Sequence, residues 1–129
     1  MQRIVLDMQS ELCAEAITKV LTDNNPDFLV YRSAKSEEVI SLCRTCRANV
    51  LVLEVTWRGG RQLSERMKLL REMRNSESGS NCKILLLVDE QADEMLAADV
   101  RQAVKDHLVN NFIYESVSPT YLAGVIDTL

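Results

Sequence analysis

The sequence predicts an α/β protein, a (βα)5 three-layer sandwich whose five-stranded parallel sheet lies between two layers of helices. Three observations predict this fold class. Five short apolar runs have the length of β-strands, and stretches with the ~3.6-residue spacing of an α-helix separate them. Glycine, proline, asparagine and serine residues, which interrupt both patterns, gather between the two kinds of segment.

The predicted strands are near-continuous apolar runs rather than alternations of apolar and polar residues. Runs of this kind are typical of parallel strands that are covered on both faces. The runs are RIVL (3–6), FLVYR (28–32), NVLVL (49–53), KILLLV (83–88) and NFIY (111–114). The connecting helices are therefore expected to cover both sides of the sheet through right-handed crossovers.

Five stretches with helical character follow these strands, one after each strand. Ser10 is the expected N-cap of the first helix, and Ser36 of the second, whose first turn carries acidic residues that the helix dipole favours. Ser118 is the expected cap of the last helix, with Pro119 at the first helical position, where its missing N–H costs nothing. The apolar positions are Leu12, Cys13, Ala16, Ile17, Val20 and Leu21 in the first helix, Val39, Ile40, Leu42, Cys43 and Cys46 in the second, Leu63, Met67, Leu70 and Met73 in the third, and Leu96, Val100, Ala103, Val104 and Leu108 in the fourth.

Length, composition and charge restrict the class of protein. A chain of 129 residues suffices for a single domain with one core and is too short for two. No apolar run approaches the ~20 residues that cross a bilayer, and the amino terminus lacks the features of a signal peptide, so we expect a cytoplasmic protein. The net charge of −4 argues against direct binding to nucleic acid, because domains that bind it usually carry a basic face.

Glu54 lies directly after the third predicted strand, at the end of an otherwise apolar run. A site in a sheet of parallel strands is expected at the carboxyl ends of the strands, near the point where the strand order reverses. The residues that follow the other strands at this edge are Met8 and Gln9, Val88 and Asp89, and Glu115 and Ser116. These positions together form the candidate site.

Two segments resemble the receiver domain of two-component response regulators. ANVLVLEVTWRGGRQL (48–63) is similar to the third strand and following loop of that family, D-L-V-L-L-D-V-x-M-P-G-x-x-G-L. Glu54 stands in the place of the phosphoacceptor aspartate and Trp57 in the place of the methionine. NFIYESVSPTYLAGVI (111–126) is similar to G-Y-L-x-K-P-x-x-x-x-x-L, with Phe112 in the place of the aromatic switch residue. The resemblance covers essentially the whole chain and implies the flavodoxin-like strand order 2-1-3-4-5.

The resemblance also implies a phosphorylation site, from which this sequence departs. Receivers hold magnesium with acidic residues after the first strand, and a threonine or serine and a lysine contact the phosphoryl group. The residues in the five places are Met8, Gln9, Glu54, Val88 and Glu115. Met8 offers no hard ligand to magnesium, and Glu115 puts a negative charge where a phosphoryl group needs a cation. If Glu115 and a phosphoryl oxygen lay ~4 Å apart, their negative charges would repel each other by about 4 kcal/mol at an intermediate dielectric constant. Asp7 lies one residue early, and strand alternation would turn its side chain to the opposite face.

We therefore expect a non-phosphorylatable pseudo-receiver that acts through protein–protein contact, is not an enzyme and needs no cofactor or metal. The expected partner is another protein, an attached effector domain or a second copy of the chain. The expected surface comprises the fourth helix, fifth strand and fifth helix, with Phe112 and Tyr121 as candidate contacts. Trp57, in the loop after the third strand, is a separate candidate contact. Because the last helix runs to Leu129, we expect residues 1–129 to be a single receiver-like domain at the N-terminus of a longer protein.

Other hypotheses remain open at this point. The chain could be an active receiver that is phosphorylated on Glu54, or on Asp7 under a shifted register. It could also be the N-terminal localisation domain of a pilus-assembly type ATPase. Glu54 itself could mimic a phosphorylated aspartate, share a proton or a cation with Glu115, or be a strand-end residue held by Arg58, Arg61 or loop amides.

Cysteines and charges have simpler explanations. Cys43 and Cys46 form a C-x-x-C in the last turn of the second predicted helix, and zinc would need two more suitably spaced ligands. The better hypothesis is that all four cysteines are unpaired and buried.

Basic residues gather in the third helix and the loop before it, and acidic residues gather before and within the fourth. Solvated helix faces are the expected explanation of both groups, and pairing between them is the alternative. The basic group is Arg58, Arg61, Arg66, Lys68, Arg71 and Arg74, and the acidic group is Asp89, Glu90, Asp93, Glu94 and Asp99.

Overall fold

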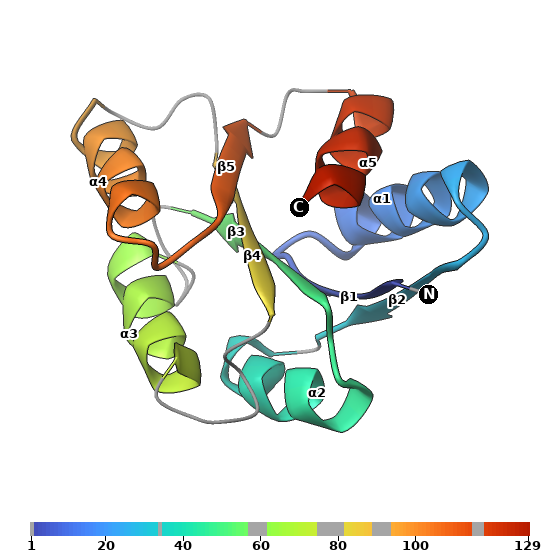
Figure 1. Ribbon diagram of the computed structural model, residues 1–129, viewed down its shortest axis with the longest axis horizontal. Helices are drawn as coiled ribbons and strands as arrows, with labels where there is room; N and C mark the ends of the chain where they lie inside the picture. Colours follow the sequence, from blue (N-terminus) through green and yellow to red (C-terminus); the bar gives the residue numbers. More distant parts are fainter. Residues whose placement is uncertain (1, 34, 57–61, 75–81, 89–93, 115–117) are drawn as a thin grey trace.

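A parallel sheet forms the centre of the protein (Figure 1). The structure is a computed structural model that describes residues 2–33, 35–56, 62–74, 82–88, 94–114 and 118–129. Five strands pair in the order β2-β1-β3-β4-β5, and every neighbouring pair is parallel. The strands are β1 (Gln2–Asp7), β2 (Phe28–Arg32), β3 (Val50–Val55), β4 (Lys83–Val88) and β5 (Asn111–Tyr114). This arrangement confirms the predicted fold class and strand order.

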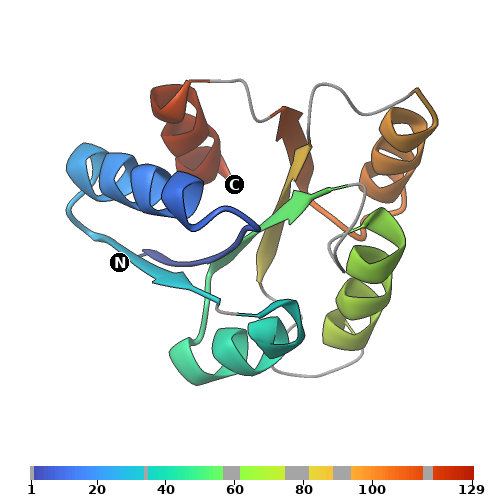
Figure 2. The ribbon, with the colours of Figure 1, turned by 180° about the vertical axis from the view of Figure 1, so that it is seen from behind.

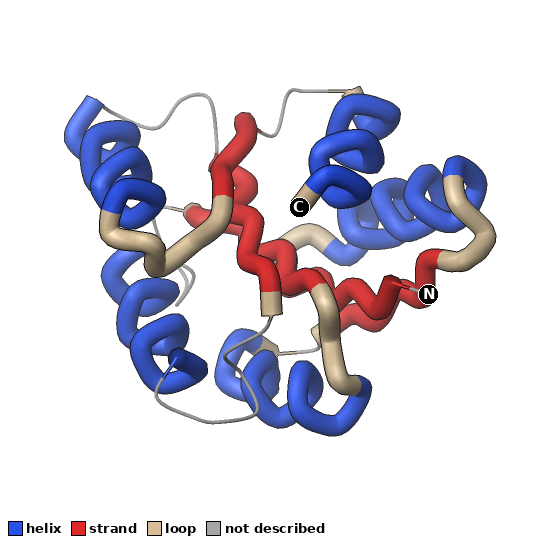
Figure 3. The backbone as a smooth tube through the Cα atoms, in the orientation of Figure 1, coloured by secondary structure: helices blue, strands red, loops and turns tan. Residues whose placement is uncertain are grey.

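Helices cover both faces of the sheet, as Figure 1 and the reverse view in Figure 2 show. On one face α1 and α5 lie side by side, and on the other lie α2, α3 and α4. Figure 3 shows the strands between these two layers. The helices are α1 (Glu11–Asn24), α2 (Val39–Cys46), α3 (Leu63–Arg74), α4 (Glu94–Lys105) and α5 (Pro119–Thr128), and a short 3-10 helix, η1 (Ser36–Glu38), precedes α2. Within the described ranges, no helix combines the length and the apolar character needed to cross a membrane.

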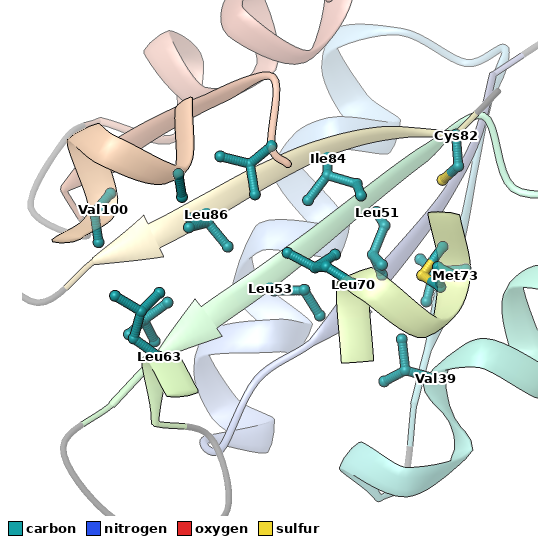
Figure 4. Packing of buried hydrophobic residues seen from close by; sticks show 14 of the residues in the cluster. Val39, Leu51, Leu53, Leu63, Leu70, Met73, Cys82, Ile84, Leu86 and Val100 are labelled. Carbon is teal, nitrogen blue, oxygen red and sulfur yellow. The ribbon is translucent and has the colours of Figure 1, made fainter. Parts of the chain in front are cut away.

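The core consists of two apolar layers, one on each face of the sheet. Leu51 and Leu53 of β3 pack in the layer beneath α2, α3 and α4, and Val52 packs in the layer beneath α1 and α5. Figure 4 shows the first layer, where Leu70 and Met73 of α3 lie over the strands. Because successive side chains of a strand point to opposite faces, β3 is buried along its whole length.

Two of the predicted helix starts are confirmed in detail. The Cys13 N–H donates a hydrogen bond to Ser10 Oγ at 3.2 Å, and the Tyr121 N–H donates to Ser118 Oγ at 3.1 Å. Each serine therefore satisfies an N–H group that the first turn leaves without a partner within the helix. The prediction is wrong for Ser36, which begins η1 instead. The Val39 N–H donates to the Ser36 carbonyl, so the 3-10 turn itself supplies the acceptor that a capping side chain would provide.

Two other expectations need correction. The strand β3 continues to Val55, because its pairing with β4 extends to Val88, and Glu54 therefore lies inside the strand rather than after it. The predicted apolar face of α1 is confirmed for Leu21, which is buried, and is wrong at the start of the helix, where Ala14 is buried instead of Leu12 and Cys13. As a result, Leu12 at 78% exposure and Cys13 face the solvent.

The position of Leu53 generates a first prediction, with Leu12 as the matched control. Leu53 is fully buried at the centre of the sheet, whereas Leu12 is exposed on α1. Leu53→Ala should lower the free energy of unfolding by about 2–5 kcal/mol, because it removes apolar contacts and leaves a cavity. Leu12→Ala should change it by less than about 0.5 kcal/mol. Urea unfolding followed by circular dichroism measures both, and equal losses would contradict this packing.

Candidate functional site

The carboxyl ends of β1 and β3 bring two acidic residues into the interior. Asp7 pairs with Leu53 across the two parallel strands, so Glu54 is one residue further along β3. Asp7 is 0% exposed and Glu54 is 6% exposed. Burying a carboxylate is costly unless it is hydrogen-bonded or paired with a cation, so the partners of each acid determine the chemistry of this edge.

Asp7 is paired with an arginine from α3. The Arg66 Nη1 group lies 2.5 Å from Asp7 Oδ2, and Arg66 is 1% exposed. The same guanidinium donates from Nη2 to the Asp7 carbonyl at 3.2 Å and from Nε to the Glu54 carbonyl at 3.0 Å. Its planar group thus contacts three oxygens at the ends of two neighbouring strands. Removing one partner of such a buried pair typically costs about 3–5 kcal/mol, because the remaining charge loses its compensation.

Glu54 is bound differently, by the backbone of the connection between β1 and α1. The Gln9 N–H donates to Glu54 Oε1 at 2.8 Å. By strand alternation Glu54 shares its face of the sheet with Val52, the side of α1 and α5. Asp7 alternates to the other side, with Val5 and α3. The two carboxyl groups therefore approach the strand ends from opposite faces, in agreement with the predicted orientation of Asp7.

We call Asp7, Gln9, Glu54 and Arg66 the strand-end site. The other predicted positions divide into two groups. Met8 and Val88 are buried and apolar, and they offer no polar group to this edge. The rest lie outside the described residues, and so do the interactions predicted for them; they are Trp57, Arg58, Arg61, Asp89, Glu115 and Ser116. Among the described residues, Glu54 is held by a loop amide, one of the partners that the sequence suggested.

Arg66 is the member of the site that the sequence analysis missed. It was assigned to a solvated basic face, and this assignment is wrong for Arg66, although Lys68 and Arg71 on the same helix are exposed. A signal was present in the spacing. Arg66 lies three residues after Leu63 and four before Leu70, on the helix face that is buried. An arginine on the apolar face of a helix indicates a buried acidic partner, here Asp7.

The residues of the site do not fit the magnesium ion that receiver domains use. Magnesium prefers about six oxygen ligands in octahedral geometry. The Asp7 carboxylate is bound to Arg66, the Glu54 carboxylate accepts from Gln9, and Met8 has no oxygen to contribute. Within the described ranges, no group of three or more histidine, cysteine, aspartate or glutamate residues is arranged to hold a metal ion.

A shallow hollow on the β5–α5 side contains two of the predicted interface residues. Its volume is about 520 Å³, and it is lined by Phe112, Ile113, Tyr114, Ser118 and Tyr121. The rings of Phe112 and Tyr114 meet edge to face, with centroids 6.0 Å apart and an interplanar angle of 86°. Tyr121 is 57% exposed. Exposed aromatic side chains of this kind are common anchors in protein–protein interfaces.

The cysteines form a cluster at the opposite end of the sheet. Cys43 and Cys46 lie in the last two turns of α2, as predicted, and Cys82 precedes β4. A hydrogen bond with Cys82 raises the pKa of the Cys43 thiol well above its usual range, and burial raises it further. Burial likewise raises the pKa of Cys46. The expectation of four buried cysteines is confirmed for Cys43 and Cys82, whereas Cys46 is only partly buried and Cys13 is exposed.

Comparisons with known proteins agree with this geometry at the level of the fold. No protein-family model matches the sequence. No curated protein matches it either. Among solved structures, the chemotaxis protein CheY4 of Vibrio cholerae superposes with a TM-score of 0.78 at 16% identity, over 99% of this chain and 98% of that chain. The signal receiver domain of a DNA-binding response regulator from Colwellia psychrerythraea gives 0.78 at 14% identity, over 99% and 97%. An orphan response regulator of H. pylori gives 0.75 at 14%, over 98% and 94%.

These structures define the class of fold, which is a flavodoxin-like α/β sandwich with the strand order 2-1-3-4-5. Within that class, the chain has the receiver-domain fold of response regulators over nearly its whole length, as the resemblance predicted. Identities of 14–16% establish the fold, and the chemistry has to be argued from the strand-end site itself.

Glu54 generates a prediction about the hydrogen bond to the loop. Glu54→Gln keeps an oxygen that accepts from the Gln9 N–H, whereas Glu54→Ala leaves this N–H without a partner. The alanine variant should therefore lose about 1–3 kcal/mol more unfolding free energy than the glutamine variant. Amide hydrogen exchange measured by NMR should accelerate at Gln9 in the alanine variant only. Equal stabilities and equal exchange rates would show that the bond does not hold the loop.

The raised pKa of Cys43 generates a prediction about alkaline pH. The folded-state pKa lies above the unfolded value of about 8.5, so the stabilisation is fully present below that pH and falls as the pH rises above it. Between about pH 8.5 and 10, Cys43 should contribute a decrease approaching 1.4 kcal/mol per pH unit. Urea unfolding at several pH values should give a flatter profile for Cys43→Ala. Cys13→Ala, which keeps the Cys43–Cys82 contact, is the control and should retain the slope.

Proposed function

We propose that this chain is a pseudo-receiver, a receiver-like signalling domain that acts through protein contact and is not phosphorylated. The observation that carries the proposal is the Arg66 guanidinium, which binds the Asp7 carboxylate and the ends of both β1 and β3. In this proposal the domain is not an enzyme, and its strand-end site has a structural role.

The chemistry of phosphoryl transfer supports the proposal. A carboxylate that accepts a phosphoryl group needs an in-line approach and cations that neutralise the charge on the transferred oxygens. Glu54 is almost completely buried, and one of its oxygens accepts from Gln9. Arg66, the cation that is paired with Asp7, directs its N–H groups at oxygens of the protein. A phosphoryl group on Glu54 would have to displace the Gln9 contact, and one on Asp7 would have to displace Arg66.

The rival hypothesis is an active receiver that is phosphorylated on Glu54 or on Asp7. For Asp7, full burial and the ion pair with Arg66 oppose the attack of its carboxylate on a donor. For Glu54, the buried position opposes it. Among the described residues, no contact favours either acid as a nucleophile, so the pseudo-receiver is the function that the geometry supports better.

The surface through which we propose that the domain acts is formed by α4, β5 and α5. It includes the hollow beside Phe112 and the exposed ring of Tyr121. An aromatic surface on a chain with a net charge of −4 suits a protein partner better than nucleic acid. A partner protein, an attached effector domain or a second copy of the chain could contribute the other half of this interface, in the cytoplasm.

Phosphodonor treatment tests the proposal directly. The purified chain is incubated with acetyl phosphate and magnesium, and its intact mass is measured at intervals alongside a conventional receiver as the positive control. We expect the receiver to gain one phosphoryl group and this chain to gain none, because neither Asp7 nor Glu54 offers an accessible carboxylate. A phosphoryl increment that disappears in Glu54→Gln or Asp7→Asn would contradict the proposal and identify the acceptor.

A further inference from the structure

The guanidinium of Arg66 lies where three oxygens from two strands converge. These are Oδ2 and the carbonyl oxygen of Asp7 and the carbonyl oxygen of Glu54, at 2.5, 3.2 and 3.0 Å from the nitrogens that donate to them. Arg66 comes from a helix and all three oxygens come from the sheet. The oxygens therefore form a cation pocket at the ends of β1 and β3, and the side chain of a different element fills it.

We propose that this pocket is a guanidinium-binding site whose ligand is the chain's own Arg66. The internal guanidinium supplies the positive charge that the buried Asp7 carboxylate needs. The inference deepens the proposed function and rests on it for its meaning in signalling. Cation binding tests this inference and phosphodonor treatment tests the proposed function, so each can fail without the other.

The geometry favours a guanidinium over other cations. A planar guanidinium presents several N–H donors in a fixed fork, so one group can contact a carboxylate and carbonyls of two strands at once. Only one of the three oxygen ligands belongs to a carboxylate, and the neighbouring Met8 adds none. A magnesium ion, which needs about six oxygens at short distances, would be under-coordinated there. An ammonium group has no planar fork to match the same arrangement.

Truncation of Arg66 would empty the space beside these oxygens that its guanidinium now fills. Arg66 lines a hollow of about 320 Å³ between η1 and α3. Three acidic residues and one lysine line it as well, namely Glu37, Glu65, Glu72 and Lys68. The carboxylates outnumber the lysine, and such an excess attracts cations. The buried Leu63 and Leu70 flank Arg66 along α3 and keep this helix packed on the sheet without the guanidinium.

Chemical rescue of Arg66→Ala tests the inference. This variant should melt at a lower temperature than the wild type, and millimolar methylguanidinium should restore most of the lost melting temperature in a saturable way. Magnesium chloride at the same concentration should restore none of it. The wild type, whose pocket is filled, should respond to neither cation. Leu70→Ala on the same helix creates a neutral cavity and should be destabilised without rescue.

Two outcomes of this experiment would contradict the inference. A destabilised Arg66→Ala that methylguanidinium does not restore would mean that the oxygens do not form a cation pocket. Rescue by magnesium alone would mean that Arg66 covers a metal site. If Arg66→Ala does not fold by itself, its folded fraction in circular dichroism with and without methylguanidinium gives the same answer, and no gain would overturn the proposal.

Discussion

The buried contact between Asp7 and Arg66 is the constraint on which the carboxyl edge of the sheet depends. Two charges in the interior are tolerated only if they neutralise each other and if their remaining donors and acceptors are satisfied. The two charges neutralise each other here, and the guanidinium also donates to the carbonyls of Asp7 and Glu54. Replacement by apolar residues of similar size could give equal stability. The ion pair also has a positional consequence, since it joins α3 to the ends of both β1 and β3.

Glu54 extends the same principle to the other face of the sheet. A carboxylate inside a strand needs a donor, and the Gln9 amide supplies one from the connection between β1 and α1. The start of α1 is thereby linked to β3, as α3 is linked to β1 and β3 through Arg66. Both acids at this edge consequently have partners within the protein, although they lie on opposite faces. Asp7 and Glu54 thus hold α3 and the start of α1 to the ends of the strands.

The sequence predicted the strands and helices well because strands that helices cover on both faces consist of continuous apolar runs. The strands β2, β4 and β5 have the predicted bounds, and both serine caps flanked by clear helical patterns are confirmed. The errors arose where a polar residue has a buried role or an apolar residue an exposed one. The apolar pattern predicts that β3 ends before Glu54 and that Leu12 lies in the core, and both predictions are wrong. The burial or exposure of such residues depends on tertiary contacts, which a local sequence pattern does not reveal.

The strand-end site was predicted only in part, for the same physical reason. Its location and the orientation of Asp7 follow from strand order and alternation, which the apolar runs encode. Arg66, the partner of Asp7, lies 59 positions further along the chain, so no local sequence pattern connects the two residues. The fold shared with response regulators at 14–16% identity thus determines where a site lies, whereas a few long-range polar contacts determine what it can bind. In this chain those contacts bind the strand ends to the chain's own arginine and amide groups. The aromatic residues beside β5 and α5 are separate from these contacts, and they lie around a hollow of their own.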